Sequence, residues 1–241
     1  MIERILPATV ACAETFAGTV GAVLVPGEEA LFSEEALFPE GALFPEEAAL
    51  VAGAVAKRRR EFAAGRHCAR RAMADLGVAP APVLRGEMGA PRWPAGIVGS
   101  ITHCAGYQAA AVARARDVLT TGVDAEPDAS LPDNVLELVA LPGERERLRA
   151  LTAAAPGTSW DRLLFSAKES VYKAWFPLTG RWLGFHDADI TVNAADGTFH
   201  ARLLVDLVDP AGADRFPLAG FAGRWLTGGG LILTAVTVPA R

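Results

Sequence analysis

The sequence predicts an α+β protein of two similar halves, residues 1–119 and 120–241, with a cleft between them. Each half contains short runs of β-branched and apolar residues, which indicate strands, together with a long helical segment. Tight turns at 104–106 and 196–197 separate neighbouring strand-like runs, so we expect mostly antiparallel sheets. The chain has 241 residues, 51% of them hydrophobic, which is enough for one large domain or two small ones.

The overall composition argues against several classes of protein. A net charge of −5 does not favour binding to nucleic acid by the field of the whole chain. Cys12, Cys68 and Cys104 are widely spaced and form no CxxC pair, so we expect reduced thiols in a cytoplasmic protein. The sequence starts without the basic and apolar regions of a signal peptide, and it has no apolar run of about 18 residues that would predict a membrane span.

The first half is expected to combine strands with a basic helix. A strand is predicted over 15–25, and a short repeat of period six follows over 29–47, to which we assign no function. Pro45 starts a helix that continues, with a break, to Asp75, where Gly77 ends it. The remaining elements are a Pro- and Gly-rich loop over 79–96 and a hairpin of strands over 97–103 and 107–116.

The second half is expected to begin with a strand over 121–126. Two helical segments follow, at about 133–152 and 159–176. The end of the chain has short alternating runs that predict antiparallel strands over 188–193, 198–206, 221–226 and 231–238.

The helix over 159–176 has Glu169 near its middle, outside the apolar face. Ser166 and Glu169 match a capping box, but the apolar periodicity begins too early for a helix that starts there. An ion pair between Glu169 and Lys173, four residues apart, is a second ordinary explanation, although it does not account for Lys168. The pattern is therefore typical of either a surface helix with ion pairs or an active-site helix.

Asp124 and Glu126 lie two residues apart at the end of a predicted strand, so both side chains point to the same face. Two such carboxylates repel each other unless a cation neutralises them. Mg²⁺ prefers a few carboxylates together with phosphate oxygens. Because charged residues are usually exposed, a solvated strand end remains the alternative to a metal site.

The helix that begins near Pro45 is strongly basic inside an acidic protein. Arg58 and Arg66 are eight residues apart, about 80° around a helix, so both can face one site. Guanidinium groups bind phosphates through paired hydrogen bonds, which suits a small molecule with several phosphates. The alternatives are a solvated helix or a nucleic-acid surface, and the net acidity argues against the latter. His103 ends a strand, where a single histidine is more often structural.

Two motifs together resemble the signature of the 4′-phosphopantetheinyl transferases. They are Gly122-Val-Asp124-Ala-Glu126 and, about forty residues later, Phe165-Ser-Ala-Lys168-Glu169-Ser-Val-Tyr-Lys173. Three further stretches, 57–70, 91–104 and 173–178, resemble the Sfp/EntD-type branch, especially its actinobacterial members associated with siderophores and polyketides. The resemblance extends over roughly residues 45–190.

The resemblance implies a pseudo-twofold enzyme of two α/β halves that binds coenzyme A in the cleft. It implies that Asp124, Glu126 and Glu169 hold Mg²⁺, with Mn²⁺ as an alternative ion, against the pyrophosphate. The other implied contacts are Arg58, Arg66, Arg85 and His103 with the adenosine 3′-phosphate region, Lys168 and Lys173 with the pyrophosphate, and Trp175 with pantetheine. Many family members have a lysine where this chain has Glu87-Met88-Gly89, so the phosphate contact is expected from Arg85 instead of Met88.

The reaction that the resemblance implies transfers phosphopantetheine to a serine of an apo acyl or peptidyl carrier protein of a fatty-acid, polyketide or nonribosomal peptide synthase. Adenosine 3′,5′-bisphosphate leaves, and Asp124, Glu169 and Lys173 are the expected catalytic residues. Glu169, or a metal-bound water beside it, is the candidate base, and Lys173 can protonate the departing phosphate. We expect a cytoplasmic monomer without nucleic-acid or membrane partners.

Two other functions also match parts of the sequence. A metal-dependent phosphoester hydrolase would use the same carboxylates and lysines, and would release product without a carrier protein. A nucleic-acid-binding module would use the basic helix, and its binding would weaken steeply with salt and not depend on Asp124. Mass analysis of a carrier protein incubated with coenzyme A and Mg²⁺ separates these alternatives from transfer.

Overall fold

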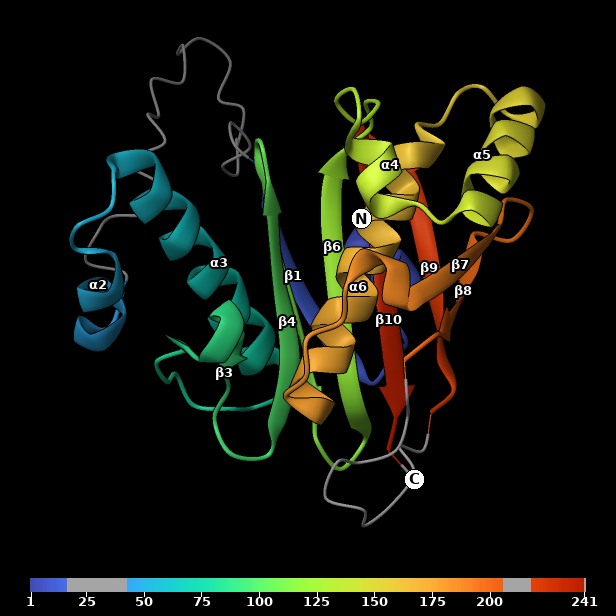
Figure 1. Cartoon of the computed structure of the whole chain (residues 1–241). Helices are drawn as coiled ribbons and strands as arrows, with labels where there is room; N and C mark the ends of the chain where they lie inside the picture. The colour runs from blue at the N-terminus through green and yellow to red at the C-terminus, as the bar shows by residue number, and fades with distance from the viewer. Residues whose placement is uncertain (17–42, 206–217, 241) are drawn as a thin grey trace, which may run out of the picture.

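The computed structural model of the chain describes residues 1–16, 43–205 and 218–240. The described residues form two antiparallel sheets, a small two-stranded ribbon and several helices (Figure 1). The predicted α+β class is confirmed. No helix among the described residues combines the length and the apolar character that crossing a membrane requires.

The first half contains one long helix and a three-stranded sheet. Its elements are η1 (Ile2–Ile5), β1 (Val10–Phe16), α2 (Pro45–Val51), α3 (Ala56–Asp75), β2 (Leu84–Arg85), η3 (Glu87–Gly89), β3 (Pro91–Arg92), β4 (Ile97–Cys104) and β5 (Tyr107–Arg114). The expected break in the helix falls between α2 and α3, and the loop expected over 79–96 contains the β2–β3 ribbon. Strand β1 begins earlier than predicted, while 17–25 and most of the 29–47 repeat lie outside the described residues.

The second half contains a five-stranded sheet and the longest apolar helix. Its elements are β6 (Val118–Pro127), α4 (Val135–Val139), α5 (Pro142–Ala154), α6 (Trp160–Thr179), η4 (Phe185–Asp187), β7 (Ala188–Asn193), β8 (Thr198–Leu203), β9 (Gly220–Gly228) and β10 (Leu231–Pro239). The single helix predicted over 133–152 is two helices, because Pro142 holds the preceding Leu141 in an extended conformation (φ −63°, ψ 155°). Helix α6 ends at Gly180, which has a positive φ of 62°.

The two halves repeat one arrangement of strands. In the first sheet the order is β1-β5-β4, and in the second it is β6-β10-β9 followed by β8 and β7. In each half the first strand pairs antiparallel with the last strand, which pairs with the strand before it in the chain. The hairpin of β7 and β8 extends the second sheet.

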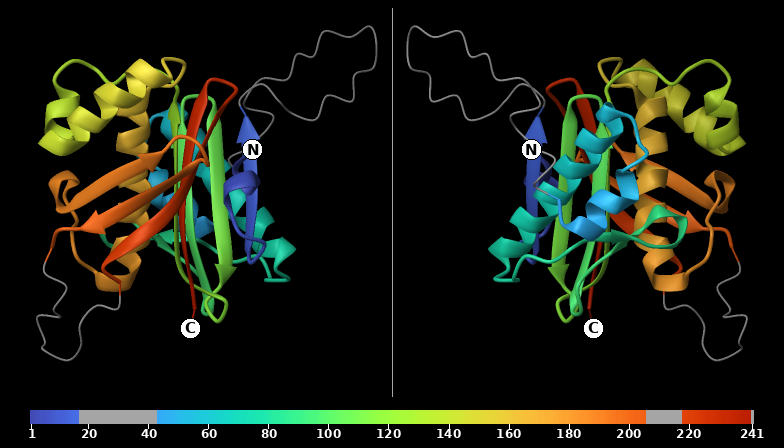
Figure 2. Two further views of the ribbon diagram at one scale, coloured as in Figure 1. Left: turned by 90° about the vertical axis from the view of Figure 1, so that its right-hand side faces the viewer. Right: turned by 90° about the vertical axis from the view of Figure 1, so that its left-hand side faces the viewer.

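The two sheets pack against each other between the two long helices (Figures 1 and 2). Helix α3 buries Ala69 and Met73 against β5, and α6 buries Leu163 and Trp175 against its own sheet. A third core lies between the sheets. It is formed by residues of both halves, namely Ile2, Ile5, Val10, Tyr107, Ala109, Ala111, Ala113, Val118, Val123, Ala125, Leu231, Leu233 and Ala235. The halves therefore share a hydrophobic core.

A fully buried glutamate joins the elements within the first half. Glu47, in the first turn of α2, accepts two hydrogen bonds from the Arg70 guanidinium of α3, at 2.9 and 3.0 Å. Its carboxylate also accepts the backbone N–H groups of Phe44 and Val83. Because both oxygens have donors, this buried charge is fully satisfied.

The second half repeats this contact with different residues. Glu144 occupies the same position in the first turn of α5 and pairs with Lys168 of α6 at 2.8 Å. It accepts the backbone N–H groups of Leu141 and Ile190. Each half therefore has a buried glutamate that ties its long helix to a shorter helix and to the chain beyond.

Candidate active site

The candidate site lies where β4 and β6, which belong to different sheets, run side by side between α3 and α6 (Figure 1). The Ser100 hydroxyl accepts a hydrogen bond from Val123 N at 3.1 Å, and the Thr102 hydroxyl accepts one from Ala125 N at 3.0 Å. Residues two apart on a strand point to the same side, so both hydroxyls of β4 reach β6. We call this contact between the four residues the β4–β6 seam. The carboxylates described next, Asp124, Glu126 and Glu169, are called the seam carboxylates.

Gly122 brings α6 close to the seam. A Cβ at this position would lie 2.1 Å from the Ser170 carbonyl oxygen and 2.6 Å from Ala174 N. The Thr120 hydroxyl donates to the Ala174 carbonyl at 2.8 Å, which holds the helix at this distance. Any side chain at 122 would therefore push α6 away from β6.

Asp124 is buried, with 4% of its surface exposed, and its two carboxylate oxygens differ. The Oδ1 atom accepts hydrogen bonds from Lys173 Nζ at 2.7 Å and from the Thr102 hydroxyl at 3.3 Å. The Oδ2 atom is buried and has no hydrogen-bond partner among the described residues. A buried carboxylate oxygen without a donor is costly, so this atom suits a bound cation.

Glu126 follows on the same strand and faces Arg162 of α6. The guanidinium donates to Glu126 Oε2 at 3.0 Å, and both side chains are about one-fifth exposed (18% and 19%). Burial and the Asp124 carboxylate raise the pKa of Glu126, while Arg162 and Lys173 oppose that rise. The prediction that Asp124 and Glu126 lie on one face is consistent with these contacts.

Glu169 lies in the middle of α6 and is partly buried. Burial raises its pKa, the Asp124 and Glu126 carboxylates raise it further, and the Lys173 ammonium lowers it. Lys173 forms its ion pair with Asp124, whereas the sequence suggested Glu169 as its partner. Three carboxylates and one lysine thus influence each other at the seam.

The three carboxylates are not yet arranged as a metal site. Among the described residues, no three His, Cys, Asp or Glu side chains surround a common point as metal ligands. Two observations still suit a divalent cation with oxygen ligands: Asp124 Oδ2 lacks a donor, and the Asp124 carboxylate raises the pKa of both glutamates. A bound cation would both satisfy the buried Asp124 oxygen and reduce the repulsion between the carboxylates.

A small hollow of about 150 Å³ lies beside the seam, between α3 and β4. Its lining includes Arg58, Arg66 and His103, three residues that were predicted to contact the 3′-phosphate region. Arg58 Nη1 lies 2.7 Å from His103 Nε2, and Glu61 is within 3.5 Å of the same guanidinium nitrogen. Burial lowers the pKa of His103, and the neighbouring Arg58 charge lowers it further, which favours a neutral imidazole.

Arg66 and Arg85 approach this hollow in different ways. Arg66 is buried, its Nε donates to the Val83 carbonyl at 3.0 Å, and its guanidinium stacks on Phe62, 3.8 Å from the ring centre. Burial lowers the pKa of Arg66 to about 10. Arg85 is exposed and lies against Gly89, another lining residue of the hollow.

Lys168 and Trp175 do not lie with the other predicted residues. The Lys168 side chain is 2% exposed, and its ammonium binds Glu144 and the carbonyls of Phe185 and Ala188. Trp175 is fully buried, with its indole N–H on the Arg181 carbonyl. The expectations that Lys168 contacts the pyrophosphate and that Trp175 lines the pantetheine are therefore corrected, because both side chains belong to the core of the second half.

Two residues at the site were missed by the sequence analysis. Thr102 bonds to both Ala125 and Asp124, and Arg162 bonds to Glu126. Side chains alternate along the strand that ends at His103, so Thr102 was expected on the opposite face from His103. This pattern did not indicate which residue Thr102 contacts. Arg162 lies seven residues before Glu169, about two helical turns away, which was the available signal for a shared face.

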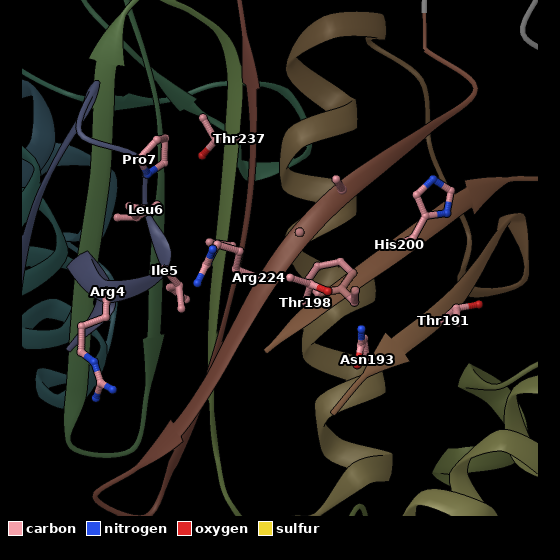
Figure 3. A pocket seen from close by; sticks show the side chains of 14 residues that line it. Arg4, Ile5, Leu6, Pro7, Thr191, Asn193, Thr198, His200, Arg224 and Thr237 are labelled. Carbon is pink, nitrogen blue, oxygen red and sulfur yellow. The ribbon is translucent and has the colours of Figure 1, made fainter. Parts of the chain in front are cut away.

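A larger hollow of about 760 Å³ lies elsewhere, on the face of the second sheet that α6 does not cover. Figure 3 shows Arg4, His200 and Arg224 on this face, contributed by η1, β8 and β9. None of the described residues that line it is Asp or Glu, and it does not include the seam carboxylates. It is therefore a separate surface feature.

The seam combines the groups needed to move a phosphoryl group. The carboxylates provide oxygen ligands for a cation, and Lys173 provides a positive charge beside them. The neighbouring hollow provides guanidinium groups that can bind a second phosphate. The arrangement suits a substrate with two separate anionic parts.

Comparison with known proteins gives matches over both halves. The model for the 4′-phosphopantetheinyl transferase N-terminal domain matches residues 46–113, and that for the 4′-phosphopantetheinyl transferase superfamily matches residues 120–209. These matches meet near the expected division of the chain.

Three curated relatives are similar over most of their length. The chain is 56% identical over 194 residues to 4′-phosphopantetheinyl transferase Svp of Streptomyces mobaraensis, covering 80% of this chain and 78% of the relative. It is 47% identical over 243 residues to 4′-phosphopantetheinyl transferase Npt of Nocardia iowensis, covering 98% and 99%. It is 50% identical over 196 residues to 4′-phosphopantetheinyl transferase PptT of Mycobacterium tuberculosis, covering 80% and 84%.

Proposed function

The chain belongs to the 4′-phosphopantetheinyl transferase family, and we propose that the β4–β6 seam is where it transfers phosphopantetheine from coenzyme A to a carrier-protein serine. The protein is a transferase whose substrate is coenzyme A and whose partners are carrier proteins of synthases. The observation that carries the assignment of the site is that Lys173, which pairs with Asp124, also lies close enough to His103 in the arginine-lined hollow to lower the pKa of that histidine.

We propose that the two anionic parts of coenzyme A bind at opposite ends of this site. Arg58, Arg66, Arg85 and His103 address the 3′-phosphate, because guanidinium groups bind phosphates through paired hydrogen bonds. Lys173 addresses the pyrophosphate from α6. The first half, 1–119, would then bind the adenosine end, and the second half, 120–241, would provide the reacting groups.

Mg²⁺ is the proposed metal, with Mn²⁺ as an alternative, and Asp124, Glu126 and Glu169 are its proposed ligands. Their support is Asp124 Oδ2, which has no partner among the residues that the structure describes, together with an all-oxygen set of donors. The ion, when bound, supplies positive charge to the phosphate oxygens.

In the proposed reaction, the carrier serine Oγ attacks the phosphorus that bears the pantetheine. The bond from that phosphorus to the bridging oxygen breaks, and adenosine 3′,5′-bisphosphate leaves. Glu169 accepts the serine proton as the general base, because it is the carboxylate that α6 places beside Asp124 and Lys173. Lys173 stabilises the charge on the departing phosphate and can give it a proton.

The enzyme is proposed to act as a cytoplasmic monomer without nucleic-acid partners. Its net charge of −5 supports the last point. The basic residues of α3 have a use in binding coenzyme A, so they do not require a nucleic-acid ligand.

The test is to incubate the full-length protein with coenzyme A, Mg²⁺ and an apo carrier protein, and to weigh the carrier by mass spectrometry. We expect each carrier to gain the mass of one phosphopantetheine. A control without carrier monitors adenosine 3′,5′-bisphosphate release, which would indicate hydrolysis. No mass gain across acyl and peptidyl carriers would contradict the proposal.

A further inference from the structure

We propose that Arg162 competes with the divalent cation for Glu126 and thereby sets how tightly the site binds Mg²⁺. The inference rests on the proposed function, because it takes the three seam carboxylates as the metal ligands. It assigns a positioning function to a residue that lies outside both sequence motifs.

The contacts of Arg162 explain why the carboxylates are not arranged as a ready metal site. Its Nη1 donates to Glu126 Oε2 at 3.0 Å, its Nε to the Ala129 carbonyl at 3.0 Å, and its Nη2 to the Ser130 carbonyl at 3.0 Å. One guanidinium therefore holds both Glu126 and the loop that follows β6. Further bonds, from Leu131 N to Asp161 and from Ser159 N to Asp128, fix the same loop to the start of α6.

Asp124 and Glu126 each have a cationic partner on one carboxylate oxygen. Of the two Asp124 oxygens, Lys173 binds Oδ1, while Oδ2 has no donor within the described part of the chain. Glu126 has a guanidinium on Oε2, at 3.0 Å. A metal that recruits Glu126 must therefore displace this bond or share the carboxylate with a positive charge.

Arg162 can release Glu126 without becoming a buried charge that lacks hydrogen bonds. Its bonds to the Ala129 and Ser130 carbonyls do not involve Glu126, and its side chain retains some contact with solvent. Glu126 is then the residue that exchanges partners, and Arg162 stays on the loop. Removing the guanidinium should make this exchange unnecessary and strengthen Mg²⁺ binding.

The experiment titrates Mg²⁺ calorimetrically into the full-length protein in the presence of saturating coenzyme A. We expect Arg162→Met to lower the Kd for Mg²⁺ about tenfold or more, the scale of one hydrogen bond to a charged group. Arg162→Lys keeps a cation at this position and should stay near the parent value. An unchanged or higher Kd for a folded Arg162→Met protein would overturn the inference.

Two controls separate the local contact from a general effect of charge. Arg149→Met removes one exposed arginine from α5, and its Kd should remain within about twofold of the parent. In a Glu126→Gln background, Arg162→Met should no longer tighten binding, and equal tightening there would refute the competition. Arg162→Gln provides a second variant if the Met variant does not fold.

The outcomes also distinguish this inference from the proposed function. Carrier modification by the parent with an unchanged Kd in Arg162→Met would remove only the competition. A parent that binds no Mg²⁺ would remove both the metal site and this inference. A parent that binds Mg²⁺ but modifies no carrier would contradict the proposed function, and the effect of Arg162 could still be measured.

Discussion

Glu169 has a raised pKa and is also the proposed general base and a proposed metal ligand. Burial and two neighbouring carboxylates raise its pKa, so protons compete for it at higher pH than for an exposed glutamate. Protonation would remove both a proposed metal ligand and the proposed base. Activity should therefore be lost as the pH falls.

Glu169→Gln should lower the rate of carrier modification about 10²-fold to 10⁴-fold, the usual contribution of a general base. The measurement is kcat/KM at a Mg²⁺ concentration below saturation, followed over pH. The parent should lose activity on acidification above the ordinary glutamate range of about 4.3. A variant that binds Mg²⁺ and coenzyme A and turns over near the parent rate would exclude Glu169 as the base.

Arg58 provides a test of the adenosine end. Arg58→Gln should raise the Kd for coenzyme A about tenfold, because one charge-assisted phosphate contact is lost. Its Kd for dephospho-coenzyme A, which lacks the 3′-phosphate, should change less than about twofold. Lys57→Gln removes the same charge from the neighbouring position and serves as control. Equal losses for both ligands would show that Arg58 does not contact the 3′-phosphate.

The elements that position the site are tied together by buried ion pairs. Lys168 of α6 pairs with Glu144 as Arg70 of α3 pairs with Glu47. The family-like motif contains Lys168 next to Glu169, but adjacent residues on a helix point about 100° apart. Lys168 therefore faces the core while Glu169 faces the seam.

Lys168→Met should lower the free energy of unfolding by about 3–5 kcal/mol, because Glu144 is left as an unpaired buried charge. Urea unfolding measures this loss, and Lys168→Met with Glu144→Gln should recover part of it. The affinity for coenzyme A of the folded protein should be unchanged. A large loss of affinity for coenzyme A without loss of stability would indicate that Lys168 contacts a phosphate directly.

Gly122 tests the packing of α6 on β6. Gly122→Ala should destabilise the protein by about 3 kcal/mol or more, because the new Cβ would overlap the Ser170 carbonyl. It should also weaken Mg²⁺ binding, since α6 carries Glu169. Gly53→Ala is the matched control, because the added Cβ would meet no described residue within 4 Å apart from its own chain neighbours. Thermal unfolding and calorimetry give both values, and a stable Gly122→Ala protein would contradict this packing.

The fold and part of the site followed from local patterns in the sequence. Alternation on a strand placed Asp124 and Glu126 together, and helical periodicity placed Glu169 off the apolar face. Thr102 and Arg162 were not predicted, because their partners Asp124 and Glu126 lie 22 and 36 residues away in the sequence. Only the tertiary structure brings these residues together. Trp175 was misplaced because a family role was carried onto a side chain that the apolar face of α6 buries.

At the scale of the whole molecule, the seam joins the two halves through two hydroxyl groups with different neighbours. Thr102 also donates to Asp124, whereas Ser100 accepts a hydrogen bond from the backbone N–H of Val123. Thr102→Val and Ser100→Ala should each cost about 1–3 kcal/mol of stability, because a buried N–H loses its acceptor. Only Thr102→Val should also weaken Mg²⁺ binding. Equal effects on Mg²⁺ would contradict a specific contact with Asp124.

The core between the two sheets has a consequence for how the enzyme selects its substrate. Residues of both halves, such as Val10 and Leu233, pack in this core, so the halves have little freedom to move apart. The separation between the arginine-lined hollow and the carboxylates is thereby fixed before any ligand arrives. In the proposed binding mode, the enzyme would distinguish coenzyme A by its length without closing around it, and a shortened analogue would engage one end of the site only.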